Sequence, residues 1–202
     1  MKERYCGGSH NRKGDDSLGF GFIHYALIRN MRPKNILCVG SWKGFIPAVC
    51  ALACKNEGRG RVDFVDAGYD GRVKEEKGKS WGGAGIWKKA TADYWKPLGV
   101  ERYIELFLMT IEDFCVCNEK NTYQYIYLDA DHRYEGVKAH FELLWPRLDN
   151  GGLFLFHDLI QAKECIWGEF GVLKFINEIK DNMKLEFLSI SRSAGLGIVR
   201  KL

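Results

Sequence analysis

Residues 123–136, YQYIYLDADHRYEG, and residues 151–160, GGLFLFHDLI, decide the fold of this chain. Each stretch begins with an apolar run of strand length, and each run ends in acidic and histidine side chains. A segment of helix length separates the two runs, so they predict a strand–helix–strand unit with two parallel, neighbouring strands. Because buried carboxylates are costly without a partner or a ligand, the two strand ends are also candidates for a chemical site.

The same alternation of apolar runs and helical patterns extends outward from this unit. Strands are predicted at residues 35–40, 61–67, 103–109, 123–130, 151–158, 183–190 and 195–202. Helices are predicted at residues 17–30, 45–55, 87–96, 110–117, 134–147 and 168–180. This order predicts an α/β fold with a mostly parallel sheet, helices on both faces and a terminal antiparallel hairpin.

The length of 202 residues predicts one domain over residues 1–202, with a polar arm at 1–16 and a long loop at 67–86. Nothing approaches the ~20 apolar residues of a membrane helix, and the polar N-terminus has no signal-peptide core. We therefore expect a cytoplasmic protein without a membrane partner. The net charge of +4 is spread along the chain, which argues against a nucleic-acid partner.

The seven cysteines are odd in number and scattered, which predicts reduced thiols rather than a disulfide framework. Cys50 and Cys54 stand one helical turn apart, so they either share a metal ion or fill the core, and core filling is favoured. Cys6 and His10 form a weaker metal pair, because nothing near them in the sequence completes a site.

The first predicted strand ends in a glycine turn. Gly40 and Gly44 allow the backbone to turn tightly and a ligand to come close, but their spacing is neither GxGxxG nor a P-loop. Asp66 ends the second strand, where a carboxylate either accepts hydrogen bonds from ribose hydroxyls or caps a turn. Together these residues favour a ligand that contains a nucleoside.

The ends of the two opening stretches are expected to meet. Asp129 on one strand and His157 and Asp158 on the next would lie within reach of one cation, because adjacent strands are roughly 4.8 Å apart. Carboxylate oxygens suit Mg²⁺ or Mn²⁺, and an imidazole favours Mn²⁺ or Fe²⁺. In the alternative interpretation, Asp131 caps the following helix and Asp158 forms a capping box with Gln161.

Residues 125–158, YIYLDADHRYEGVKAHFELLWPRLDNGGLFLFHD, resemble a branch of the class I S-adenosylmethionine-dependent methyltransferases. That branch, methyltransferase family 24, carries the pattern DxDHxYxGV followed by GG and HD. The resemblance extends over roughly residues 17–202. It implies a Rossmann-like sheet of seven strands with the last strand antiparallel.

The resemblance also implies roles for individual residues. Gly40 and Gly44 would border the methionine end of S-adenosylmethionine, Asp66 would bind the ribose, and Thr110 and Ile111 would contact the adenine. The full set of implied cofactor-binding residues is Gly40, Ser41, Gly44, Asp66, Ala67, Thr110, Ile111 and Asp129.

For the chemistry, the resemblance implies a divalent metal, Mg²⁺ or Mn²⁺, at Asp129, His157 and Asp158, and His132 as a general base. The chain departs from the family in three places. Cys38 replaces an acid before the first glycine, the pair His157–Asp158 replaces Asp-Asn or Glu-Asp, and His140 replaces an acid in the crossover helix.

The expected reaction is metal-assisted O-methylation of a small hydroxylated metabolite, catalysed by Asp129 and His132, in a protein that pairs as a homodimer. The loop at 67–86 is either a candidate lid, with Trp81, Trp87 and Trp95 as walls of an acceptor pocket, or a solvated loop whose aromatic side chains pack on the core. Its cationic residues that would attract an acidic acceptor are Arg72, Lys77 and Lys79. Two alternatives stay open: a protein that binds S-adenosylmethionine without catalysis, and an NAD(P)-dependent oxidoreductase.

Overall fold

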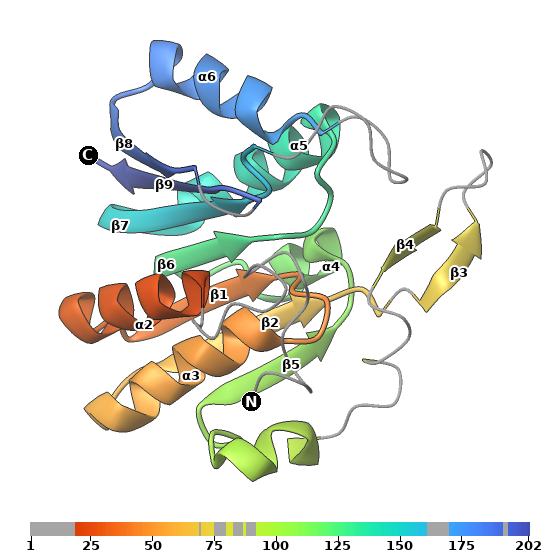
Figure 1. The fold of residues 1–202 in the computed structure, drawn as a ribbon, viewed down its shortest axis with the longest axis vertical. Coiled ribbons are helices and arrows are strands. Elements are labelled where there is room, and N and C mark those ends of the chain that lie inside the picture. Colours follow the sequence, from red (N-terminus) through yellow and green to blue (C-terminus); the bar gives the residue numbers. More distant parts are fainter. Residues whose placement is uncertain are drawn as a thin grey trace.

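The computed structural model describes residues 19–68, 70–74, 80–82, 87, 92–160, 170–191 and 194–202. A seven-stranded sheet forms its centre, in the order β5-β2-β1-β6-β7-β9-β8 (Figure 1). Its strands are β1 (Asn35–Val39), β2 (Arg61–Asp66), β5 (Ile104–Leu108), β6 (Tyr123–Leu128), β7 (Leu148–His157), β8 (Leu185–Ile190) and β9 (Leu196–Lys201). The first five run parallel, and β9 is antiparallel to both β7 and β8. The predicted α/β fold, its seven strands and its terminal hairpin are confirmed.

Helices cover both faces of the sheet. On one face α2 (Phe20–Met31) and α3 (Phe45–Glu57) lie side by side, and the other face carries α4 (Ile111–Cys117), α5 (Tyr134–Leu144) and α6 (Val172–Asn182) (Figure 1). A short 3₁₀ turn, η2 (Trp145–Arg147), follows α5 within the range predicted as one helix. No helix in the described part of the chain is both long and apolar enough to cross a membrane.

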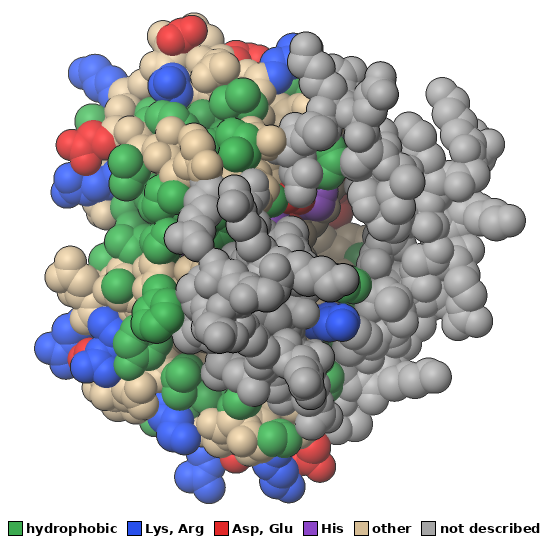
Figure 2. Space-filling model, viewed as in Figure 1, with side chains coloured by type: hydrophobic (Ala, Val, Ile, Leu, Met, Phe, Trp, Pro, Cys, Tyr) green, Lys and Arg blue, Asp and Glu red, His purple; other side chains and the backbone are tan. Residues whose placement is uncertain are grey.

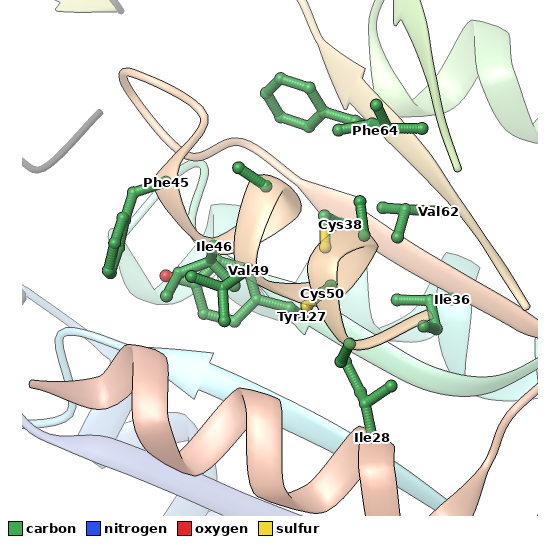
Figure 3. Packing of buried hydrophobic residues seen from close by; sticks show 14 of the residues in the cluster. Ile28, Ile36, Cys38, Phe45, Ile46, Val49, Cys50, Val62, Phe64 and Tyr127 are labelled. Atoms are coloured by element: carbon green, nitrogen blue, oxygen red, sulfur yellow. The ribbon is translucent and has the colours of Figure 1, made fainter. Parts of the chain in front are cut away.

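Each face of the sheet has its own hydrophobic core. Because successive strand residues point to opposite faces, β1 contributes Ile36 and Cys38 to one core and Leu37 and Val39 to the other. Figure 3 shows the first core, in which Cys38 lies close to Cys50 of α3.

The cysteines of α3 fill the core, as favoured from the sequence. Cys50 and Cys54 are fully buried free thiols, and the metal-type group found among the described residues does not contain them. The pair Cys6 and His10 lies outside the described residues, as do Cys165 and the polar arm at 1–16.

The region between β2 and β5 differs most from the prediction. Part of the loop at 67–86 forms an antiparallel ribbon, β3 (Asp70–Lys74) and β4 (Ser80–Gly82), which projects beyond the carboxyl ends of the parallel strands (Figure 1). The helix predicted at 87–96 is instead a 3₁₀ helix, η1 (Ala92–Leu98), which contains Pro97, a residue without the N–H that an α-helix needs.

Two of the tryptophans predicted to wall a pocket belong to the core. The side chains of Trp87 and Trp95 are each 1% exposed, so for these two the pocket-wall interpretation is wrong and the alternative of packing on the core is confirmed. Both rings contact Phe64 of β2, where large aromatic side chains gain most from burial. The side chains of the other residues assigned to the loop, Arg72, Lys77, Lys79 and Trp81, lie outside the described residues.

Candidate functional site

The ends of β6 and β7 bring two acids and a histidine together. Strands β6 and β7 are parallel neighbours, with Leu128 paired to Phe156, so the residues that follow them share one edge of the sheet. Nδ1 of His157 lies 3.1 Å from Oδ1 of Asp129 and 3.1 Å from Oδ1 of Asp158. One imidazole therefore contacts both carboxylates.

The conformation of Asp158 makes this arrangement possible. Consecutive side chains of a regular strand point to opposite faces, which would separate the side chains of His157 and Asp158. Asp158 has a φ of 56°, in the left-handed region that aspartate tolerates better than most residues. The turn that begins there leaves both side chains on the same side as Asp129.

A second histidine completes the cluster. Nε2 of His132, in the turn after β6, lies 3.2 Å from Oδ1 of Asp129 and 3.2 Å from Oδ2 of Asp158. Ligand atoms of Asp129, His132 and Asp158 all lie within 4.8 Å of one another, the spacing of a set that can hold a metal ion. Acidic and histidine side chains come together in a hollow of the face shown in Figure 2.

The two histidines differ in accessibility. The side chain of His132 is 21% exposed, whereas that of His157 is 1% exposed. The ring of His132 also stacks on Phe170, at 5.1 Å between centroids, and Phe20 of α2 contacts the edge of His157. The sequence assigned the metal to His157 with the two acids, while the structure places His132 equally close to both carboxylates.

The charges of the cluster compensate each other. Burial acts to raise the pKa of the Asp129 carboxyl, but His157 and His132 together hold it well below its usual value. Burial acts to lower the pKa of His157, and the two carboxylates raise it to about 10 instead. The two carboxylates thus favour the protonated form of His157.

Tyr127 is a member of the site that the sequence did not single out. Its hydroxyl group donates a hydrogen bond of 2.9 Å to Oδ2 of Asp129, and its side chain is fully buried. Residues two apart on a strand share a face, so the spacing from Tyr127 to Asp129 was the available signal. The hydrogen bond occupies one oxygen of Asp129 and leaves the other to the two histidines.

The glycine turn after β1 touches this cluster directly. Gly40 has a φ of 67°, and a Cβ atom there would lie 2.2 Å from the carbonyl oxygen of Asp129. The N–H of Asp129 donates to the carbonyl of Val39, and the N–H of Gly40 donates to the carbonyl of Val65. The turn, the end of β2 and the end of β6 are therefore one connected unit.

Ser41 presents a polar atom without a protein partner. Its side chain is 1% exposed, and its Oγ has no hydrogen-bond partner within the described part of the chain. A buried hydroxyl group without a partner is costly, so its place in this turn suits a ligand with a polar group. Gly44, the last residue of the turn, precedes the first residue of α3.

Asp66 is the last residue of β2, and Ala67 follows it beside this turn. Oδ1 of Asp66 accepts a hydrogen bond of 2.8 Å from the N–H of Gly68, so the turn-capping role weighed for it is present. Burial, with a smaller contribution from the charge of Asp129, raises the pKa of Asp66 to about 6. Its second carboxylate oxygen makes no such turn contact within the described part of the chain.

Three other predicted residues have clear local contacts. Thr110 is the N-cap of α4, where its hydroxyl accepts a hydrogen bond from the N–H of Asp113, and the neighbouring Ile111 is buried. Asp131 forms an ion pair with Arg133 and accepts its backbone N–H, so it supports the turn before α5. Gln161, the other half of the capping box considered for Asp158, lies outside the described residues.

Comparison with known proteins identifies a family. A family model described as "Methyltransferase domain" matches residues 37–159. The "Probable caffeoyl-CoA O-methyltransferase 1" of Dictyostelium discoideum is 24% identical over 139 residues, which are 67% of this chain and 52% of that protein. The chain thus spans about half the length of the curated relatives it matches.

Solved structures share the fold. The O-methyltransferase TomG from Streptomyces achromogenes, involved in tomaymycin synthesis and solved with S-adenosylmethionine, gives a TM-score of 0.66 at 14% identity, covering 93% of this chain and 81% of its own. The O-methyltransferase from Bacillus cereus, solved with S-adenosylhomocysteine, gives a TM-score of 0.66 at 15% identity. The match covers 95% of this chain and 84% of the Bacillus cereus chain.

Proposed function

The chain belongs to the methyltransferase-domain family, within the class I S-adenosylmethionine-dependent methyltransferases, and from this premise we propose that it O-methylates a small hydroxylated metabolite with the help of a divalent cation. One observation carries the finer part of the proposal. Asp129 and Asp158 present carboxylate oxygens within 4.8 Å of each other, beside the glycine turn of the cofactor site, and Nε2 of His132 lies 3.2 Å from both carboxylates.

The turn at Gly40 suits S-adenosylmethionine. Gly40 leaves room for close approach of a ligand, and Oγ of Ser41 is a buried polar atom that a cofactor group would satisfy. Asp66 would accept hydrogen bonds from the ribose hydroxyls, as a carboxylate at the end of the second strand does in related folds. The absence of GxGxxG from this turn disfavours a dinucleotide and thus the oxidoreductase alternative.

The two acids suit a hard cation. Asp129 and Asp158 supply carboxylate oxygens, the ligands that Mg²⁺ and Mn²⁺ prefer, and both cations accept further oxygen ligands from solvent or substrate. A cation bound there would supply Lewis-acid polarisation of the acceptor oxygen. His157, nearly inaccessible, contacts both carboxylates from within the protein and fixes their separation.

His132 is the residue to accept the proton. It is the more exposed of the two histidines, and its Nε2 faces the same two carboxylates that would bind the cation. We assign Nε2 the proton that the acceptor hydroxyl loses as its oxygen takes the methyl group. The same nitrogen cannot also bind the cation. His132→Ala should therefore slow methyl transfer but leave the Kd of the cation within about twofold of the wild-type value.

The acceptor is proposed as a class only. The named relatives that act on a caffeoyl thioester make a phenolic hydroxyl one member of that class, alongside sugar and other natural-product hydroxyls. A panel of these acceptors, with and without Mg²⁺ or Mn²⁺, is the direct assay. Production of S-adenosylhomocysteine that requires both an acceptor and a cation would support the proposal.

Calorimetric titration with S-adenosylhomocysteine is the first experiment. Micromolar binding that Asp66→Ala weakens would support the cofactor site, and Asp129→Ala and Asp158→Ala should abolish cation stimulation. Binding without turnover on any acceptor would favour the alternative of a non-catalytic S-adenosylmethionine-binding protein. No binding at all would contradict the proposed cofactor site.

A further inference from the structure

The turn that would hold the cofactor is strained. Three of its five residues have positive φ angles: Gly40 at 67°, Trp42 at 39° and Gly44 at 72°. Glycine adopts this conformation without cost, but a bulky residue such as Trp42 does so only when the surroundings hold it there. The turn therefore depends on contacts from elsewhere in the fold.

Two aromatic side chains make those contacts. The indole Nε1–H of Trp87 donates a hydrogen bond of 2.8 Å to the carbonyl of Trp42, and the hydroxyl group of Tyr94 donates one of 3.1 Å to the carbonyl of Lys43. A peptide unit is planar and trans, so a fixed carbonyl also fixes the N–H on its opposite side. Trp87 and Tyr94 thus orient two consecutive peptide planes of the turn.

The donors themselves are held rigidly. Trp87 stacks on Trp95 at 5.5 Å between ring centroids and meets Phe64 of β2 edge-on at 4.9 Å. A Cβ atom on Gly44 would lie 2.6 Å from the ring of Trp87, so the turn and the ring are in direct contact. Tyr94 packs edge-on against both tryptophans.

We propose that Trp87 and Tyr94 are positioning residues for the cofactor turn: they hold residues 40–44 in the conformation that binds S-adenosylmethionine, without touching the cofactor. The proposal rests on the cofactor site proposed above. It gives the segment after β4 a role that differs from the pocket wall predicted for Trp87 from the sequence. Trp87 and Tyr94, which lie 45 and 51 positions after their partners in the turn, would thus influence the affinity of the turn for the cofactor.

Trp95 offers a matched control. Its side chain is 1% exposed, like that of Trp87, and belongs to the same aromatic stack, but its Nε1–H has no hydrogen-bond partner in the described part of the chain. Both rings lie beside Gly44, so Trp87→Phe and Trp95→Phe remove the same atoms from the same core, and only the first removes a hydrogen bond to the turn. Tyr94→Phe removes a single hydroxyl group and is the mildest of the three changes.

The experiment measures the Kd of S-adenosylhomocysteine by calorimetry for the wild-type protein and the three variants. Loss of one net hydrogen bond to the turn should raise the Kd about three- to tenfold in Trp87→Phe and in Tyr94→Phe. Trp95→Phe should stay within about twofold of the wild-type protein, even if its thermal stability falls as far as that of Trp87→Phe.

Amide hydrogen exchange in the ligand-free protein gives a second readout. Exchange within residues 40–45 should accelerate in Trp87→Phe and Tyr94→Phe and remain at the wild-type rate in Trp95→Phe, because only the first two release the turn. A Kd for Tyr94→Phe and Trp87→Phe equal to that of the wild-type protein would overturn this proposal alone. A wild-type protein that binds no S-adenosylhomocysteine would overturn the cofactor site and this proposal with it.

Discussion

Tyr127 and Asp129 stand two positions apart on the same face of the chain, and the tyrosine hydroxyl donates a hydrogen bond of 2.9 Å to Oδ2 of the carboxylate. The opposite oxygen, Oδ1, faces His157 and His132 at 3.1 and 3.2 Å. The hydrogen bond therefore prevents rotation of the carboxylate and keeps Oδ1 directed at the cluster. A phenol on a buried strand sets the orientation of the central acid.

Tyr127→Phe should weaken binding of Mn²⁺ about three- to tenfold, because Asp129 loses the hydrogen bond that orients it. Tyr125→Phe is the control, since Tyr125 is equally buried on the same strand but its hydroxyl group meets His24 instead. Titration of Mn²⁺ followed by electron paramagnetic resonance gives both affinities. Equal affinities in the two variants would show that the tyrosine does not orient the acid.

Gly40→Ala should destabilise the protein and abolish binding of S-adenosylhomocysteine. The new Cβ atom would lie 2.2 Å from the carbonyl oxygen of Asp129, and the backbone at φ 67° would also be strained. Gly58→Ala is the matched control, because Gly58 has a φ of 65° and nothing within 4 Å of an added Cβ. Urea unfolding should show that Gly40→Ala costs about 1–3 kcal/mol more than Gly58→Ala; equal costs would mean that the close contact is absent.

Asp66→Asn should stabilise the folded protein at neutral pH. Burial raises the pKa of Asp66 to about 6, above its unfolded value, so the folded state holds this proton more tightly. The resulting stabilisation is complete below about pH 4 and is lost as the pH rises through about 6. Asparagine does not titrate, so the advantage of the variant over the wild-type protein should grow from about pH 4 upward and reach up to about 3 kcal/mol above pH 6.

Urea unfolding at about pH 4 and at about pH 7.5 tests this expectation. The gain should appear only at the higher pH, and Asp181→Asn, at an exposed position of α6, should show no such difference. The same Asp66→Asn variant should bind S-adenosylhomocysteine more weakly. A loss of stability at neutral pH would mean that the Asp66 carboxylate is a net stabilising group.

His157→Gln should cost far more stability than His132→Gln. His157 is almost fully buried between Asp129 and Asp158, and removing one partner from a buried charge cluster costs about 3–5 kcal/mol. His132 is partly exposed, where solvent replaces much of the lost interaction, so its change should cost about 1 kcal/mol. Unfolding in the presence of a chelator, which removes any bound cation, measures the free energy of unfolding of both variants. Equal losses of stability would contradict the different roles of the two histidines.

The sequence predicted the sheet well because its central strands, such as β1 and β6, are buried on both faces. Continuous apolar runs such as residues 123–128 and 151–156 are typical of central parallel strands. The helix-length segment between them predicted that the two strands are neighbours, with their carboxyl ends at the same edge of the sheet. Strand adjacency was enough to predict that the strand ends that carry Asp129, His157 and Asp158 lie next to each other. Local pattern and tertiary structure agree in this part of the chain.

The remaining features depend on contacts that no local pattern contains. The positive φ of Asp158, the placement of His132 against both acids and the burial of Trp87 all arise from packing between distant segments. The ribbon of β3 and β4 was missed because its glycine- and lysine-rich residues have low strand propensity. Tyr127 lies in a strand that was predicted correctly, but the hydrogen bond of its hydroxyl group to Asp129 was not predicted.

Strand β9 lies between β7 and β8 in the sheet, although it is synthesised after both. As the chain emerges from a ribosome, β8 has no neighbour among the described strands until β9 has also emerged, and the apolar edge of β7 stays open to other chains. Nascent protein should therefore expose an unpaired, aggregation-prone strand edge until β9 has emerged. A stop codon before Leu196 would give an aggregating product rather than a smaller folded protein, and a chaperone that shields strand edges would act in this interval.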